Sequence, residues 1–85
     1  MFVTKLSDDS RRVLSVILSK GVATGTDLQW ATELTPEQLI AAVEPLMQLE
    51  LIGVSGDPLT PKGILDAYFN LRPSARNTIA QYLSL

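Results

Sequence analysis

The side chains that could catalyse a reaction or hold a metal ion are few and scattered in this sequence. The chain has no cysteine and no histidine, which removes thiolate chemistry, the commonest metal ligand and the commonest general base. Asp8 and Asp9 are adjacent, but both stand where a helix begins and suit the positive end of its dipole. The other carboxylates have no spacing that suggests a metal cage. We therefore expect no catalytic residue, no metal and no cofactor, and a protein that is not an enzyme.

The segment GVATGTD, residues 21–27, combines glycines and threonines near the start of a predicted helix. Backbone N–H groups at a helix start can bind an anion. The segment lacks the Gly-Lys-Ser/Thr ending of a phosphate-binding loop. We therefore do not expect nucleotide binding.

Length and composition predict a single globular domain over residues 1–85. The chain is 46% hydrophobic and carries a formal net charge of −2. No apolar run approaches the roughly 18 residues of a membrane span. The first residues also lack the apolar stretch of a signal peptide. We expect a cytoplasmic protein with no membrane partner.

Three helices are predicted in the first half of the chain. Ser7 is placed to cap a helix that continues through Lys20 and stops at Gly21. After a short extended segment, Thr26 and Gln29 have the spacing of a capping box at the start of a second helix. Thr35-Pro36-Glu37-Gln38 repeats that spacing and predicts a third helix to about Glu50. The predicted buried stripe of this third helix consists of Leu39, Val43 and Leu46.

The second half is predicted to hold a hairpin and two helices. Residues 51–54 read as a strand and 59–60 as a short return strand after a turn. Thr60-Pro61 opens a helix by the rule of a cap followed by proline, and this helix is expected to carry Ile64, Leu65, Tyr68, Phe69 and Leu71. Pro73 should interrupt it, because proline cannot continue a helix. A last helix is predicted over residues 74–83.

The segments TPEQLIAAVEPLMQLELIG (35–53) and LTPKG (59–63), in this order of elements, resemble the winged helix-turn-helix domains of the MarR, ArsR and PadR repressors. The resemblance covers residues 7–63. It implies a mostly α fold with a small β-hairpin: a three-helix core, a wing, and a C-terminal helical extension over residues 61–85. In such repressors the third helix enters the DNA major groove, and a helix after the wing commonly forms a dimer. A homodimer is thus expected by resemblance; the alternative is that the last helices fold back over the core. The candidate dimer contacts are Tyr68, Phe69, Ile79, Tyr82 and Leu83.

The charge pattern departs from that of a DNA reader. Residues 21–61 contain six acidic residues and no lysine or arginine, a formal charge of −6. The flanking segments, 1–20 and 62–85, each carry +2. Glu37 and Glu44 fall on one face of the third helix, away from its apolar stripe, and would meet DNA phosphates with like charge. A plainer alternative is that they only solubilise an exposed helix.

Three positions depart from the resembled pattern. Pro45 would remove a hydrogen bond inside the third helix, so we expect that helix to be kinked or broken. Glu33 and Glu50 stand where the resembled turns favour glycine, and a left-handed backbone at such residues costs on the order of 1 kcal/mol. We therefore expect these turns to differ from those of the family.

The third helix also carries apolar residues that one stripe cannot use, namely Ile40, Met47 and Leu49, and Trp30 occupies a commonly exposed position. They either join the core or form an exposed contact patch. Our leading interpretation is a protein–protein interaction module whose partner has a basic surface. Its contact face would be Trp30, Glu37, Ile40, Ala41, Glu44 and Met47.

The alternative is a DNA-binding transcriptional regulator, although the acidic third helix disfavours DNA as the partner. It would need basic residues from outside residues 21–61 to converge on one surface. Those candidates are Arg11, Arg12, Lys62, Arg72 and Arg76.

Overall fold

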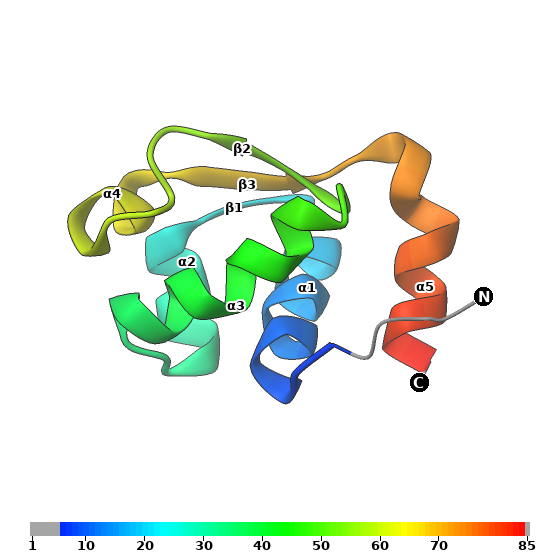
Figure 1. Cartoon of the computed structure of the whole chain (residues 1–85), viewed down its shortest axis with the longest axis horizontal. Coiled ribbons are helices and arrows are strands. Elements are labelled where there is room, and N and C mark those ends of the chain that lie inside the picture. The colour runs from blue at the N-terminus through cyan, green and yellow to red at the C-terminus, as the bar shows by residue number, and fades with distance from the viewer. Residues whose placement is uncertain (1–5, 85) are drawn as a thin grey trace.

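The first helix, α1 (Asp8–Lys20), forms where the sequence predicts it. The computed structural model describes residues 6–84, with side chains described to residue 81 (Figure 1). The hydroxyl of Ser7 accepts a hydrogen bond from the Ser10 backbone N–H at the start of α1. Gly21 ends the helix with a positive φ of 82° while its N–H bonds the Ile17 carbonyl. The buried side of α1 carries Val13, Leu14 and Ile17.

The second helix, α2 (Gly25–Thr32), follows the short strand β1 (Val22–Thr24) and begins earlier than predicted. Thr24 is its cap: the Thr24 hydroxyl accepts from the Asp27 N–H at 3.1 Å, and the Asp27 carboxylate accepts from the Thr24 N–H at 3.0 Å. The predicted capping box of Thr26 and Gln29 is therefore wrong. The Thr26 hydroxyl instead donates to the Leu65 carbonyl, a partner distant in sequence.

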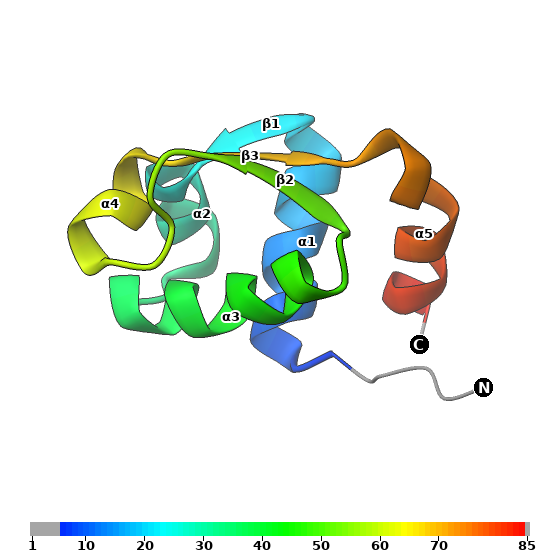
Figure 2. The same ribbon diagram turned by 45° about the horizontal axis from the view of Figure 1, so that its top comes forward.

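The third helix, α3 (Pro36–Gln48), starts at the predicted capping box and continues through Pro45. Figures 1 and 2 show it as one continuous helix, so of the two predicted outcomes the break is wrong, and the kink stays a prediction. Pro45 lies in the last turn, and the carbonyl that loses its partner belongs to Ala41, an exposed residue where water can replace the bond. On the buried side, the Ser10 hydroxyl donates to the Ala42 carbonyl at 2.7 Å and ties α1 to α3.

The wing differs from the predicted hairpin because a helix is inserted in it. Strand β2 (Ile52–Ser55) is followed by helix α4 (Pro61–Asp66) and then strand β3 (Tyr68–Leu71). Residues 59–60 do not form a strand; Thr60 caps α4 instead. The sheet is antiparallel in the order β1-β3-β2. The expected helix through Leu71 is wrong because Phe69 and Leu71 are buried while Tyr68 and Asn70 are exposed, the period-two pattern of a strand.

The C-terminal region follows the predicted interruption at proline. A short 3-10 turn, η1 (Pro73–Ala75), leads into α5 (Arg76–Ser84), and Ile79 of α5 is fully buried. In Figures 1 and 2, α1, α2 and α3 lie beneath the sheet, with α4 at one end of the molecule and α5 at the other.

These elements form a mostly helical fold with a small three-stranded sheet, so the predicted winged helix-turn-helix fold is confirmed. The predicted division into a core over 7–63 and an extension over 61–85 stays a prediction; the central strand of the sheet lies within the second range. Within residues 6–84, no helix combines the length and apolarity needed to cross a bilayer.

Candidate nucleic-acid interface

The turn between α2 and α3 keeps a left-handed residue although no glycine is present. Glu33 has φ 61° and ψ 22°, and its N–H bonds the Gln29 carbonyl. Glu50, just after α3, likewise has a positive φ of 58°. We expected the glutamates to make these turns differ from those of the resembled family, and for the backbone conformation this expectation is wrong. The backbone adopts the left-handed conformation at both sites despite its steric cost.

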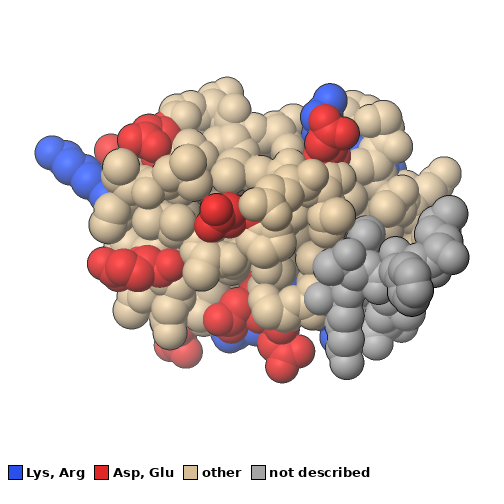
Figure 3. Space-filling model, in the orientation of Figure 1, with Lys and Arg blue, Asp and Glu red and all other residues tan. Residues whose placement is uncertain are grey.

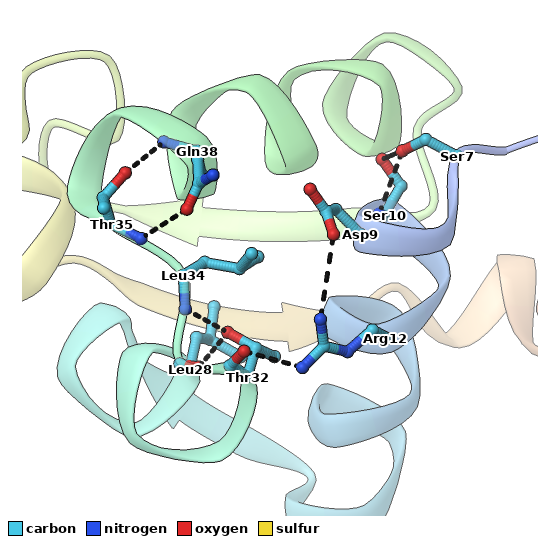
Figure 4. A network of polar contacts seen from close by, with 9 residues as sticks. All are labelled: Ser7, Asp9, Ser10, Arg12, Leu28, Thr32, Leu34, Thr35 and Gln38. Carbon is cyan, nitrogen blue, oxygen red and sulfur yellow. Dashed lines mark hydrogen bonds and ion pairs between the residues drawn. The ribbon is translucent and has the colours of Figure 1, made fainter.

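A hydrogen-bond network fixes this turn against α1 (Figure 4). The Arg12 guanidinium donates to the Thr32 carbonyl at 2.6 Å and lies 3.8 Å from the Asp9 carboxylate. The Thr32 hydroxyl donates to the Leu28 carbonyl at 2.6 Å and accepts from the Leu34 N–H at 3.4 Å. Arg12 is thus engaged by the fold. Nothing in the sequence pattern signals its pairing with a residue twenty positions away.

The start of α3 is set by reciprocal bonds between Thr35 and Gln38 (Figure 4). The Thr35 hydroxyl accepts from the Gln38 N–H at 3.2 Å, and the Gln38 side-chain carbonyl accepts from the Thr35 N–H at 2.9 Å. These bonds satisfy N–H groups that a helix start leaves without partners. The helix that would enter a groove therefore begins at a well-defined residue.

The outer surface of α3 is acidic and polar. Glu37, Gln38, Ala41, Glu44 and Gln48 are exposed along it. Neither α2 nor α3 contains a lysine or arginine. Figure 3 views the molecule from this side and shows acidic side chains over α3 and the wing, with basic side chains at the margins. The charge pattern predicted from the sequence is thus present on the folded surface.

The surplus apolar residues of α3 pack inward. Ile40, Met47 and Leu49 are half-buried and contact the core cluster, so the core-packing alternative is the correct one. Trp30 differs, because 82% of its surface is exposed. The predicted contact face therefore divides into exposed Trp30, Glu37, Ala41 and Glu44 on one hand and half-buried Ile40 and Met47 on the other.

The five basic candidates for DNA contact do not converge. Arg11 and Arg12 lie on α1, Lys62 on α4, and Arg76 on α5, with Arg72 just before η1. Helices α4 and α5 are at opposite ends of the molecule (Figures 1 and 2). Arg72 lies 3.7 Å from Glu50, a pair of exposed side chains. Lys62 shares its end of the molecule with the start of α3.

The candidate dimer contacts are only partly available on the surface. Phe69 and Ile79 have no exposed area because both belong to the core of the single chain, so their assignment to a dimer contact is wrong. Tyr68 is 56% exposed. The side chains of Tyr82 and Leu83 lie outside the described residues.

In the described part of the chain, no group of three or more acidic side chains could hold a metal ion.

The α2–turn–α3 unit and the β2–α4–β3 wing define a winged helix-turn-helix domain, the fold of MarR-like repressors. Two solved structures share this fold. BpsR of Bordetella bronchiseptica, whose DNA binding is regulated by 6-hydroxynicotinic acid, matches with a TM-score of 0.73 and 21% identity, over 94% of this chain and 55% of that one. AdcR, the adhesin competence repressor of Streptococcus pyogenes, matches with a TM-score of 0.67 and 21% identity, over 94% and 57%. This chain thus spans about half the length of these proteins. No family model and no curated protein sequence matches it.

The comparisons correct the leading interpretation of the sequence. Both structural neighbours are regulators, one described by its DNA binding and the other as a repressor, and neither is described as a docking module or an enzyme. The interpretation of the α3 face as a protein-binding surface for a basic partner, with DNA disfavoured, is therefore wrong. The packing of Ile40 and Met47 against the core leaves Trp30 and Ala41 as the exposed apolar members of the patch that had favoured it.

Proposed function

We propose that this chain is the DNA-binding winged-helix domain of a transcriptional regulator without enzymatic activity. The observation that carries the proposal is the shared arrangement of helix-turn-helix and wing, which extends over 94% of the chain in both neighbours. A cytoplasmic location belongs to the same proposal, because a bacterial-type regulator works where the chromosome is. A homodimer also stays a prediction, consistent with two half-sites one helical turn apart.

The acidic α3 surface limits how the domain would bind DNA. Glutamate accepts a hydrogen bond from the exocyclic amine of cytosine, and glutamine pairs with adenine, so Glu37, Glu44 and Gln48 have the chemistry to read base edges. They cannot neutralise phosphates, which normally supply most of the affinity. Phosphate contact would come from the wing, where Lys62 is exposed on α4. We therefore expect weak DNA binding, with few phosphate contacts and with base edges read by acidic and amide groups.

Fluorescence anisotropy with labelled duplexes at low salt tests this function. Duplexes rich in C·G pairs and in A·T pairs are titrated with the chain over a series of salt concentrations. We expect saturable binding that favours the C·G duplex, with log affinity falling by about one per tenfold rise in salt for each phosphate contact. Absence of binding to either duplex at low salt, at protein concentrations that saturate a non-specific site, would refute the proposal.

A further inference from the structure

Trp30 is the single tryptophan of the chain and lies in the last turn of α2 with 82% of its surface exposed. Leu28 and Thr32, two residues before and after it, are buried. Because a helix turns by about 100° per residue, Trp30 points away from the core. The first helix of the helix-turn-helix unit therefore presents its indole ring to solvent.

The helix that carries Trp30 is held by hydrogen bonds at both ends. At its start, the Thr26 hydroxyl donates to the Leu65 carbonyl of α4 at 3.0 Å. At its end, the Thr32 carbonyl accepts from the Arg12 guanidinium at 2.6 Å. Trp30 thus stands on a fixed support, and a tryptophan side chain has only two torsion angles to order when it binds a partner.

Trp30 lies on the part of the domain where DNA would dock. Thr26 is one turn before Trp30 on the same side of α2, and its bond to α4 places this side next to the wing. After Trp30, the chain leads through the turn to Pro36, the first residue of α3. In a helix-turn-helix complex the first helix crosses the DNA backbone while the second enters the major groove. Entry of α3 into the groove would therefore bring Trp30 to the sugar–phosphate backbone.

The indole ring suits a backbone contact that α2 cannot make with charge. Helix α2 contains no lysine or arginine, and Glu33 is exposed in the turn that follows it. A phosphate near this turn would meet one like charge and no cation from α2. The ring of Trp30 is apolar and can cover an uncharged deoxyribose, and its N–H is a neutral donor for a phosphate oxygen.

We propose that Trp30 contacts the sugar–phosphate backbone of duplex DNA, with its ring on a deoxyribose and its N–H donating to a phosphate oxygen. The inference rests on the proposed DNA-binding function and assigns it a further contact residue. Because the side chain is neutral, it neutralises no phosphate. The contact therefore adds affinity without adding to the salt dependence of binding.

The fluorescence of Trp30 tests the contact directly, because no other tryptophan contributes to it. The full chain is titrated with unlabelled duplex at low salt, and N-acetyltryptophanamide corrects for absorption by the DNA. We expect a saturable change in emission with the same dissociation constant as the anisotropy titration, and weaker quenching by acrylamide in the complex. Binding by anisotropy without a change at Trp30 overturns this inference and leaves the proposed function standing. Absence of binding by anisotropy overturns both.

Matched variants separate the contact from effects on the fold. Trp30→Ala should weaken duplex binding by about fivefold, the size expected for one neutral hydrogen bond, with an unchanged slope of log affinity against log salt. Trp30→Phe keeps an aromatic ring without the N–H, so its affinity should fall between the two. Both variants should keep the urea midpoint, because the side chain is exposed.

Val22→Ala is the control for loss of exposed apolar surface. Val22 is 60% exposed and pairs with Asn70, near the end of β3 that leads to η1 and α5. This substitution should leave the affinity for DNA unchanged. An unchanged affinity for Trp30→Ala, or an equal loss for Val22→Ala, overturns the inference. Acrylamide quenching that weakens with protein concentration in the absence of DNA also overturns it and shows that a second copy of the chain covers Trp30.

Discussion

Gly25 of α2 packs directly against the backbone of Ile64 in α4. A methyl group built on Gly25 would overlap the Ile64 carbonyl oxygen and approach the Leu65 Cα within 2.9 Å. The Gly25 N–H also bonds the Ala67 carbonyl at 3.0 Å. Together with the bond from the Thr26 hydroxyl to the Leu65 carbonyl, this contact fixes the wing to the start of α2. Through these contacts, the wing packs against the start of α2 in the helix-turn-helix unit.

Replacing Gly25 with alanine should destabilise the fold strongly. The added methyl group meets backbone atoms, which cannot rotate away, so α2 and α4 must separate; overpacking of this kind costs about 1–3 kcal/mol and occasionally more. Urea unfolding followed by circular dichroism measures the change in free energy of unfolding. Gly21→Ala shows the effect of backbone strain without a clash, because Gly21 has a positive φ of 82° and open space around its Cβ position. An unchanged free energy of unfolding for Gly25→Ala would contradict the close packing.

Glu33 and Glu50 have a left-handed backbone, so replacing either with glycine should stabilise the fold. Glu33→Gly should raise the free energy of unfolding by about 0.5–1 kcal/mol, because relief of left-handed strain exceeds the entropy that glycine adds to the unfolded chain. Glu50→Gly should act in the same direction, since its pair with Arg72 is exposed and contributes little. The measurement is the urea midpoint at constant slope.

Glu44→Gly is the matched control for this pair. It makes the same chemical change at an exposed position inside α3, where the backbone is an ordinary helix. There glycine should lower the free energy of unfolding by about 0.5–1 kcal/mol relative to a good helix former. If all three substitutions lowered it, the turns would not hold the strain that their φ angles indicate.

Sequence patterns predicted the elements whose signals are local. Ser7, Thr35 and Gln38 form the expected caps because a capping bond spans only three residues. The buried stripe of Leu39, Val43 and Leu46 follows from helical spacing. The interruption at Pro73 follows from the covalent geometry of proline.

The misassigned elements depend on contacts between distant residues. Thr24 competes with Thr26 for the cap, and the choice is settled by the bond of Thr26 to Leu65 and the contact of Gly25 with α4. Tyr68 to Leu71 form a strand because both β1 and β2 pair with them, which no local pattern reveals. The hydrogen bond of Arg12 to Thr32 was missed for the same reason, because these two residues meet only in the folded chain. The sequence predicted the distribution of charge correctly, but this distribution did not identify the partner.

Asp27 should make the stability of α2 depend on acidity. The hydrogen bond from the Thr24 backbone N–H is the main cause that lowers the pKa of Asp27 below its ordinary value of 3.8. A lowered folded-state pKa contributes stability that is fully present above the unfolded value and is lost as the pH falls through the lower folded value. The urea midpoint should therefore fall with acidification below pH 3.8, and Asp27→Asn should reduce this fall. Parallel midpoint curves for both proteins would show that the capping carboxylate contributes no such dependence.

Lys62 and Arg76 distinguish the end of the molecule at which DNA would bind. Each is an exposed cation, but α4 lies beside the start of α3 while α5 lies at the far end (Figure 1). If the wing contacts a phosphate, Lys62→Ala should weaken binding of every duplex to a similar degree and reduce the slope of log affinity against log salt by about one. Arg76→Ala, which removes the same charge, should leave that slope unchanged in the same anisotropy titration. A slope that responds to Arg76→Ala and not to Lys62→Ala would place the DNA against the other end of the domain and refute contact through the wing.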